Sequence, residues 1–251
     1  MSDLTRGLQE LGIPFGIVGA LVPELLLDAR PDRRTNDADV VVVVESLPDF
    51  NGLKDRLADY GFTRTGLPHR LQRGDGGWVD ILPFSEAIAP DGYLELEEGF
   101  VLNMAGFGQV VPNAVSVPID GGPTVPVAPL PLYVLLKLVA FNDREQTKDL
   151  AGVVHCLEHY LEEDDRRYGV DHNGEGVPYE CTCAYLLGVD ARSFLDEPVS
   201  NAARLVLGRL DDPDATVIGD VIHETGRFPV EDERRRETVE FFRWYRLGTG
   251  L

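Results

Sequence analysis

The sequence feature that most constrains the fold is Asp37-Ala38-Asp39 followed by five consecutive valines, Val40 to Val44. Such a run of β-branched apolar residues predicts a strand buried on both faces, as inside an α/β sheet. Because side chains alternate along an extended chain, Asp37 and Asp39 are expected to point to the same side where this strand begins. Neighbouring carboxylates repel each other unless a cation lies between them, which favours a divalent metal such as Mg²⁺. The alternative is a pair of solvated turn residues.

The composition restricts the classes of partner. The chain has 251 residues and a net charge of -20, which argues against a broad positive surface for nucleic acid or anionic membrane. A polyanionic substrate would therefore need a local group of arginines or lysines. The three cysteines are an odd number and no signal peptide precedes them, which indicates a reducing compartment. No apolar run is long enough to cross a membrane, so we expect a cytoplasmic protein.

The order of the predicted elements indicates an α+β fold in two parts. Up to about residue 127, apolar runs and amphipathic segments alternate, which predicts an α/β-type domain with a mixed sheet. From residue 128 the periodicity is helical, so we predict one domain over residues 1–127 and a helical domain over 128–251. The expected strands are 15–18, 37–44, 71–73, 78–82, 116–119 and 124–127, and the expected helices are 2–12, 21–29, 48–60, 130–141, 148–161, 179–187, 201–210 and 232–245.

Two further features bear on the chemistry of the first domain. Gly19-Ala20 joins a predicted strand to a predicted helix, an arrangement that can aim backbone N–H groups at an anion, although any tight turn needs small residues. Asp80 is the one carboxylate within the apolar strand 78–82, and a buried carboxylate is rare unless it is paired or bound to metal. If that strand lies beside the valine strand, Asp80 becomes a third acid near Asp37 and Asp39.

The helical half contains a second unusual segment. The chain has only three lysines, and two of them, Lys137 and Lys148, lie within twelve residues of each other. Lys137 interrupts an apolar helix, where a charged group is normally avoided. It either extends along its aliphatic stem to solvent or contributes a point charge to a phosphate.

Together these motifs resemble the nucleotidyltransferase superfamily, which combines a Gly-containing turn before a helix, Thr35-x-Asp37-x-Asp39 opening an apolar strand, and a lone aspartate on a later strand. A more particular resemblance, to the AbiEii/AbiGii family of nucleotidyltransferase toxins, comes from the block Lys137-x-x-Ala140-Phe141-x-Asp143-Arg144-x-x-x-Lys148-Asp149 and from Ala184-Tyr185-Leu186-Leu187-Gly188-Val189-Asp190. The resemblance covers roughly residues 17–190.

The resemblance implies transfer of a nucleoside monophosphate from a nucleoside triphosphate to an acceptor. It implies that Asp37 and Asp39, with Asp80, hold Mg²⁺ or Mn²⁺, and that Asp149 orients a lysine or assists the acceptor. The residues implied in binding the nucleotide and its phosphates are Gly19, Ala20, Thr35, Lys137, Arg144 and Lys148. Ala20 departs from the superfamily, which often has serine there, so its backbone N–H groups must suffice.

Three functions stay open from the sequence. The acceptor is RNA, such as tRNA, in a toxin-like setting with an antitoxin partner, or it is a cationic small molecule of the aminoglycoside type, which the net charge of -20 suits better. The third is a non-catalytic nucleotide- or partner-binding module.

Other residues are weaker candidates. His155 and His159 have metal-binding spacing, but the sequence offers no evident further ligand, so helix-surface histidines are favoured. The Arg234-Arg235-Arg236 run reads as a solvated helix face, or else as a small patch for RNA.

Overall fold

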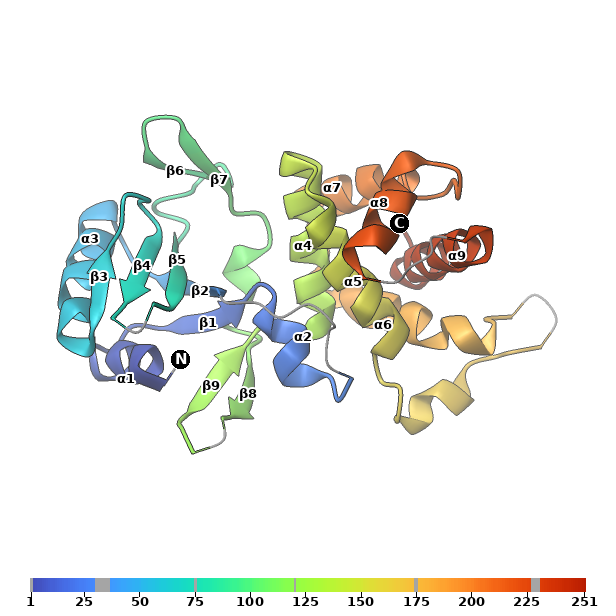
Figure 1. The fold of residues 1–251 in the computed structure, drawn as a ribbon, viewed down its shortest axis with the longest axis horizontal. Coiled ribbons are helices and arrows are strands. Elements are labelled where there is room, and N and C mark those ends of the chain that lie inside the picture. The colour runs from blue at the N-terminus through green and yellow to red at the C-terminus, as the bar shows by residue number, and fades with distance from the viewer. Residues whose placement is uncertain (1, 30–36, 75, 120, 174–175, 227–230) are drawn as a thin grey trace. The chain divides into compact units, whose positions relative to one another are not determined.

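The computed structural model describes residues 2–29, 37–74, 76–119, 121–173, 176–226 and 231–251; at Asp37 it describes the backbone only. The chain divides into two compact units (Figure 1). We call Met1–Leu25 with Thr35–Pro129 the sheet unit, and Leu26–Arg34 with Leu130–Leu251 the helical unit. The two units meet in sequence at Pro129 and Leu130, whereas the assignment of Leu26–Arg34 to the helical unit has no counterpart in the sequence pattern. The domain boundary near residue 128 stays a prediction.

The sheet unit is built on a mixed sheet of seven strands, with the valine strand β2 at its centre. Val40, Val41 and Val42 have no exposed surface, which confirms the prediction of a strand buried on both faces. β2 pairs antiparallel with β1 and parallel with β5. The strands in spatial order are β3 (Phe62–Arg64), β4 (Arg70–Arg73), β5 (Trp78–Phe84), β2 (Asp37–Val43), β1 (Phe15–Val18), β9 (Thr124–Val127) and β8 (Val115–Pro118).

Short helices and a separate ribbon complete the sheet unit. Its helices are α1 (Ser2–Glu10), α2 (Leu21–Leu26), α3 (Leu47–Arg56), η1 (Leu57–Tyr60) and η2 (Phe107–Gln109). Ser46 begins α3 because its hydroxyl accepts a hydrogen bond from Asp49 N, an N-cap. β6 (Tyr93–Glu97) and β7 (Phe100–Asn103) form a two-stranded ribbon that projects from the sheet unit in Figure 1. The ribbon packs on a small core of its own around Ala89, Leu94 and Met104.

The helical unit is a bundle of helices (Figure 1), in which α6 packs extensively against α9. A Cβ at Gly188 of α6 would lie 2.9 Å from Thr249 N, so glycine there allows the two backbones to approach each other. Phe241 and Phe242 of α9 are buried in the core of this unit. The helices are α4 (Leu130–Arg144), α5 (Thr147–His159), η3 (Asp165–Gly169), η4 (Tyr179–Cys181), α6 (Thr182–Ala191), η5 (Arg192–Phe194), α7 (Glu197–Gly208), α8 (Thr216–Glu224) and α9 (Asp232–Thr249).

The α+β class and most elements agree with the sequence predictions, with three corrections. The helix predicted to begin at residue 201 begins at Glu197, because Asp196 accepts a hydrogen bond from Val199 N as an N-cap and proline fits the first turn. The helix predicted over 21–29 ends at Leu26. Strand β3, the ribbon of β6 and β7, and helix α8 have no counterpart among the predicted elements.

Candidate active site

Two acidic side chains lie next to each other on neighbouring strands of the sheet. Asp39 of β2 is the register partner of Asp80 of β5, and the two strands are parallel. Residues directly opposite each other on neighbouring strands project from the same face, about 5 Å apart. Asp39 is half-buried and Asp80 is 9% exposed. The sheet therefore brings the second and third acids together, as the sequence predicted on the condition that their strands were neighbours.

The turn after β1 closes against Asp39. Val18, the last residue of β1, is the register partner of Asp39, and Gly19 follows with φ of +73°. A Cβ at position 19 would lie 2.6 Å from Asp39 Cγ and overlap the carboxylate itself. Only glycine combines this backbone conformation with this close approach. The missing side chain lets the Asp39 carboxylate pack directly against the turn.

Arg70 holds Asp80 from the other side. Arg70 Nε donates to Asp80 Oδ1 and Arg70 Nη2 donates to Asp80 Oδ2, each at 2.7 Å. This is the bidentate geometry of a strong arginine–carboxylate pair. His69 Nε2 lies 3.8 Å from Asp80 Oδ2, and its ring stacks on Phe100. Burial lowers the pKa of His69, since the opposing charge of Asp80 does not outweigh it. The imidazole is therefore neutral near pH 7.

Arg70 and His69 were not among the predicted site residues. The four residues 74–77 between the expected strands 71–73 and 78–82 are typical of a hairpin, which would bring the segment around residue 70 beside Asp80. The observed antiparallel register places Arg70 opposite Asp80. The contact of His69 with Phe100 of β7 depends on the unpredicted ribbon, so no local pattern reveals it.

A second carboxylate centre lies within the helical unit, between α4 and α5. Asp149 is fully buried and accepts hydrogen bonds from Lys137 Nζ at 2.9 Å and from Arg144 Nε and Nη2 at 2.8 and 2.7 Å. Burial alone would raise the pKa of Asp149, but the hydrogen bonds from Arg144 and the charge of Lys137 outweigh it and lower that pKa. Lys137 thus contacts the carboxylate for which the resemblance implied the orienting of a lysine.

Of the remaining predicted site residues, two are described in full and two are not. Ala20 is half-buried in the turn before α2, and Lys148 is exposed in the first turn of α5. Thr35 lies outside the described residues, and so does the side chain of Asp37, although its backbone begins β2. The structure thus groups Gly19, Asp39 and Asp80 in the sheet unit, and Lys137, Arg144 and Asp149 in the helical unit.

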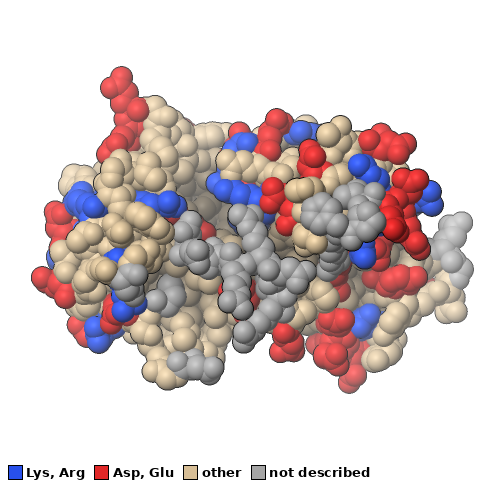
Figure 2. Space-filling view, viewed as in Figure 1, with Lys and Arg blue, Asp and Glu red and all other residues tan. Residues whose placement is uncertain are grey.

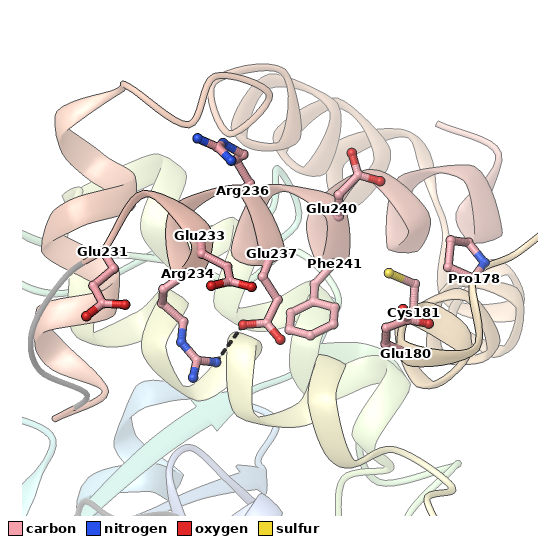
Figure 3. Close-up of a pocket in the computed structure, with 10 residues that line it drawn as sticks. All are labelled: Pro178, Glu180, Cys181, Glu231, Glu233, Arg234, Arg236, Glu237, Glu240 and Phe241. Atoms are coloured by element: carbon pink, nitrogen blue, oxygen red, sulfur yellow. Dashed lines mark hydrogen bonds and ion pairs between the residues drawn. The ribbon is translucent and has the colours of Figure 1, made fainter.

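A pocket of about 590 Å³ occurs in the helical unit, beside the first turns of α9 (Figure 3). Most of its charged lining is acidic and includes Glu233, Glu237 and Glu240. Arg234 is paired with Glu237 at 2.7 Å, the dashed contact in Figure 3, and Arg235 donates to Pro213 O at 2.9 Å. Because these two arginines are engaged within the unit, they favour the interpretation as a helix face over that as a patch for RNA. Figure 2 shows acidic side chains spread over the visible face of the helical unit.

No protein-family model matches the chain, and no curated protein matches it. Among solved structures the chain is similar to an antigenic nucleotidyltransferase-like protein from Paracoccidioides brasiliensis, with 17% identity, a TM-score of 0.45, and coverage of 90% of this chain and 89% of that one. It is also similar to the antibiotic-resistance factor ANT(2'')-Ia, with 16% identity, a TM-score of 0.35, and coverage of 57% of this chain and 70% of that one. Similarity at this level does not identify a reaction or a substrate, so the function has to be argued from the side chains.

Within the described residues, no helix is both long and apolar enough to span a bilayer.

Proposed function

We propose that the protein is a nucleotidyltransferase that moves a nucleoside monophosphate from a nucleoside triphosphate to an acceptor hydroxyl or amine. The observation that supports this most is the pairing of Asp39 with Asp80 across two parallel strands, with Gly19 packed directly on the Asp39 carboxylate. Adjacent acids near the start of neighbouring strands suit a reaction that depends on positioning and on charge neutralisation.

The donor set fits a hard divalent cation. Carboxylate oxygens are the ligands that Mg²⁺ and Mn²⁺ prefer, and the sheet register sets Asp39 beside Asp80, with Gly19 packed against the Asp39 carboxylate. Asp37 and Asp39 would hold the ion, with Asp80 as the third acid. When bound, the ion would neutralise the charge that develops on the oxygens around the α-phosphorus. A cation bound in this way would offset the repulsion between the neighbouring carboxylates.

Asp80 is proposed to act on the acceptor. Its two oxygens are held by Arg70, yet a carboxylate has lone pairs beyond those two hydrogen bonds. In the proposed step the acceptor atom forms a bond to the α-phosphorus, the bond from that phosphorus to the bridging oxygen breaks, and pyrophosphate leaves. Asp80 orients the acceptor hydroxyl and receives its proton at a carboxylate oxygen. Arg70 keeps Asp80 in one orientation throughout.

The phosphate contacts are proposed from the sequence resemblance. Gly19 and Ala20 would present backbone N–H groups, and Thr35 would contribute from the segment before β2. Exposed Lys148 would contact a phosphate directly. Lys137 and Arg144 are both bound to Asp149, and a fully buried carboxylate suits the role of orienting them better than that of touching the acceptor.

For the acceptor we propose two candidates. The first is RNA, including tRNA, in the cytoplasm and in a toxin-like setting with an antitoxin partner, as the AbiEii/AbiGii resemblance implies. The second is a cationic small molecule, which the net charge of -20 and the acidic lining of the pocket favour. A non-catalytic nucleotide-binding module would bind the triphosphate without releasing pyrophosphate, and the absence of a serine hydroxyl at Ala20 is the argument for it.

The experiment that tests the proposal is transfer of label from each α-³²P nucleoside triphosphate to total RNA, to proteins and to cationic small molecules, with Mg²⁺ or Mn²⁺. Treatment with ribonuclease separates the two acceptor classes, because activity that survives it favours the small molecule. Asp39→Asn should abolish labelling, whereas Asp59→Asn, an exposed aspartate of η1, should not. Nucleotide binding without label transfer or pyrophosphate release would show that the protein is a binding module.

A further inference from the structure

Three potential metal ligands share one face of helix α5, in the helical unit. His155, Glu158 and His159 each offer one ligand atom, and these atoms all lie within 4.8 Å of one another. The spacings of three and four residues place them on neighbouring turns of the helix. The sequence suggested only the histidine pair, since a third donor was not evident from its spacing. The folded helix supplies that donor as Glu158.

Each histidine has a hydrogen-bond partner of the kind that supports metal ligands. His155 Nε2 lies 2.9 Å from Ala29 O, and His159 Nδ1 lies 2.8 Å from Glu162 Oε2. Metal-binding histidines almost always donate their other ring N–H to a carbonyl or carboxylate, which fixes the tautomer and raises the basicity of the ligating nitrogen. Because Nδ1 of His159 is bonded to Glu162, the ligating nitrogen would be Nε2, which lies 3.9 Å from Glu158 Oε2.

The three side chains are neither closed off nor fully solvated. All are half-buried, and the Glu158 side chain is only 10% exposed. Arg234 Nη1 lies 3.9 Å from Glu158 Oε1, a distance at which it attracts the carboxylate without a direct hydrogen bond, and it is bonded to Glu237.

From this geometry we propose that His155, Glu158 and His159 form a binding site for a divalent transition metal, with Zn²⁺ as the simplest occupant. Two imidazoles and one carboxylate are a known ligand set for zinc, with an open fourth position, whereas Mg²⁺ prefers oxygen ligands alone. Ligand atoms around a tetrahedral zinc are about 3.3 Å apart, so closure needs side-chain rotations of roughly 1 Å. The site is independent of the proposed Mg²⁺ site and of nucleotidyl transfer.

The test is equilibrium dialysis of the full-length protein against Zn²⁺, with excess Mg²⁺ present to occupy the carboxylates of the sheet unit. We expect one bound zinc per chain. Glu158→Gln, which keeps the shape of the side chain, and His159→Ala should each weaken binding by more than about tenfold, and Glu162→Gln by about tenfold through loss of the supporting hydrogen bond. His223→Ala is the matched control on an exposed histidine and should bind zinc as the parent does. Circular dichroism of each variant confirms that it is folded.

Co²⁺ provides a second readout that separates this site from the three buried cysteines. A Co²⁺ complex with nitrogen and oxygen ligands shows visible absorption without the thiolate charge-transfer band in the near ultraviolet. Absence of stoichiometric zinc, zinc binding that Glu158→Gln and His159→Ala leave unchanged, or a thiolate band would each overturn the proposal. Loss of the zinc in Glu158→Gln with normal folding would establish it, whatever the outcome for nucleotidyl transfer.

Discussion

Each unit of the molecule contains an aspartate gripped by an arginine through two hydrogen bonds, yet the two aspartates have different surroundings. Asp80 lies on a sheet next to half-buried Asp39 and pairs with Arg70. Asp149 is enclosed between two helices, and a second cation, Lys137, completes its hydrogen bonds. The same ion pair can thus orient a reactive group at an open strand end or stabilise a core between helices. Burial and the neighbouring charges distinguish the two uses.

The largest effect should come from removing the enclosed carboxylate. Asp149→Ala should lower the free energy of unfolding by about 3–5 kcal/mol, because largely buried Lys137 loses the partner that offsets its desolvation. Urea denaturation followed by circular dichroism measures this change. Glu240→Gln is the control: it removes an exposed pair with Arg243 and should cost under about 1 kcal/mol. Equal losses for the two variants would show that the Asp149 pair contributes no more than a surface pair.

Asp39→Asn should reduce label transfer without reducing stability, the opposite of what is expected for Asp149→Ala. The proposed metal loses a charged ligand, so label transfer should fall by about a hundredfold or more, while the free energy of unfolding should stay the same or rise as repulsion with Asp80 is relieved. The matched control is Asp59→Asn, which removes one negative charge from an exposed position of the same unit. An Asp39→Asn protein that transfers label normally would remove Asp39 from the proposed reaction.

The sequence predicted the sheet better than the ion pairs because strands and helices are local patterns. The valine run and the apolar strand around Asp80 determine that both segments are buried, and β2 and β5 then bring Asp39 and Asp80 together. Pairing of Lys137 with Asp149 depends on how α4 and α5 pack, since twelve residues and a bend of the chain separate them. Such a contact has no signature in either helix taken alone.

The elements that sequence analysis missed are those with little burial or weak end signals. In β6 only Leu94 is buried, so the alternation that marks a half-buried strand is short. Helix α8 has nine residues and no side-chain cap at Ala215, so no residue marks its beginning. His69 acquires its place next to Asp80 partly through Phe100 of the missed ribbon, which is why it was not a candidate.

Gly19 and Gly12 allow the contact with Asp39 to be separated from the effect of the backbone conformation, with smaller expected changes in stability. Gly19 and Gly12 have similar backbone conformations, with φ of +73° and +68°, but a Cβ at Gly12 would meet nothing within 4 Å. Both substitutions to alanine should cost about 1–2 kcal/mol of stability for the left-handed backbone. Gly19→Ala should in addition displace Asp39 and reduce label transfer by about tenfold or more, whereas Gly12→Ala should leave transfer unchanged. Equal label transfer by the two variants would contradict the role proposed for the close contact between Gly19 and Asp39.

The smallest effect should be the contribution of Asp149 to the pH dependence of stability. Its pKa is lowered in the folded protein, so the unfolded chain binds more protons in acid, and stability must rise with pH in that range. The contribution is complete above the unfolded pKa of about 3.9 and is lost as the pH falls through the folded value. Urea unfolding of the parent and of Asp149→Asn, between neutral pH and the most acidic pH at which both stay folded, should give a stability difference that shrinks below about pH 4. A difference that stays constant down to the acid limit would mean that Asp149 keeps the same proton affinity when the chain unfolds, and the two cations would then orient the carboxylate without stabilising its charge.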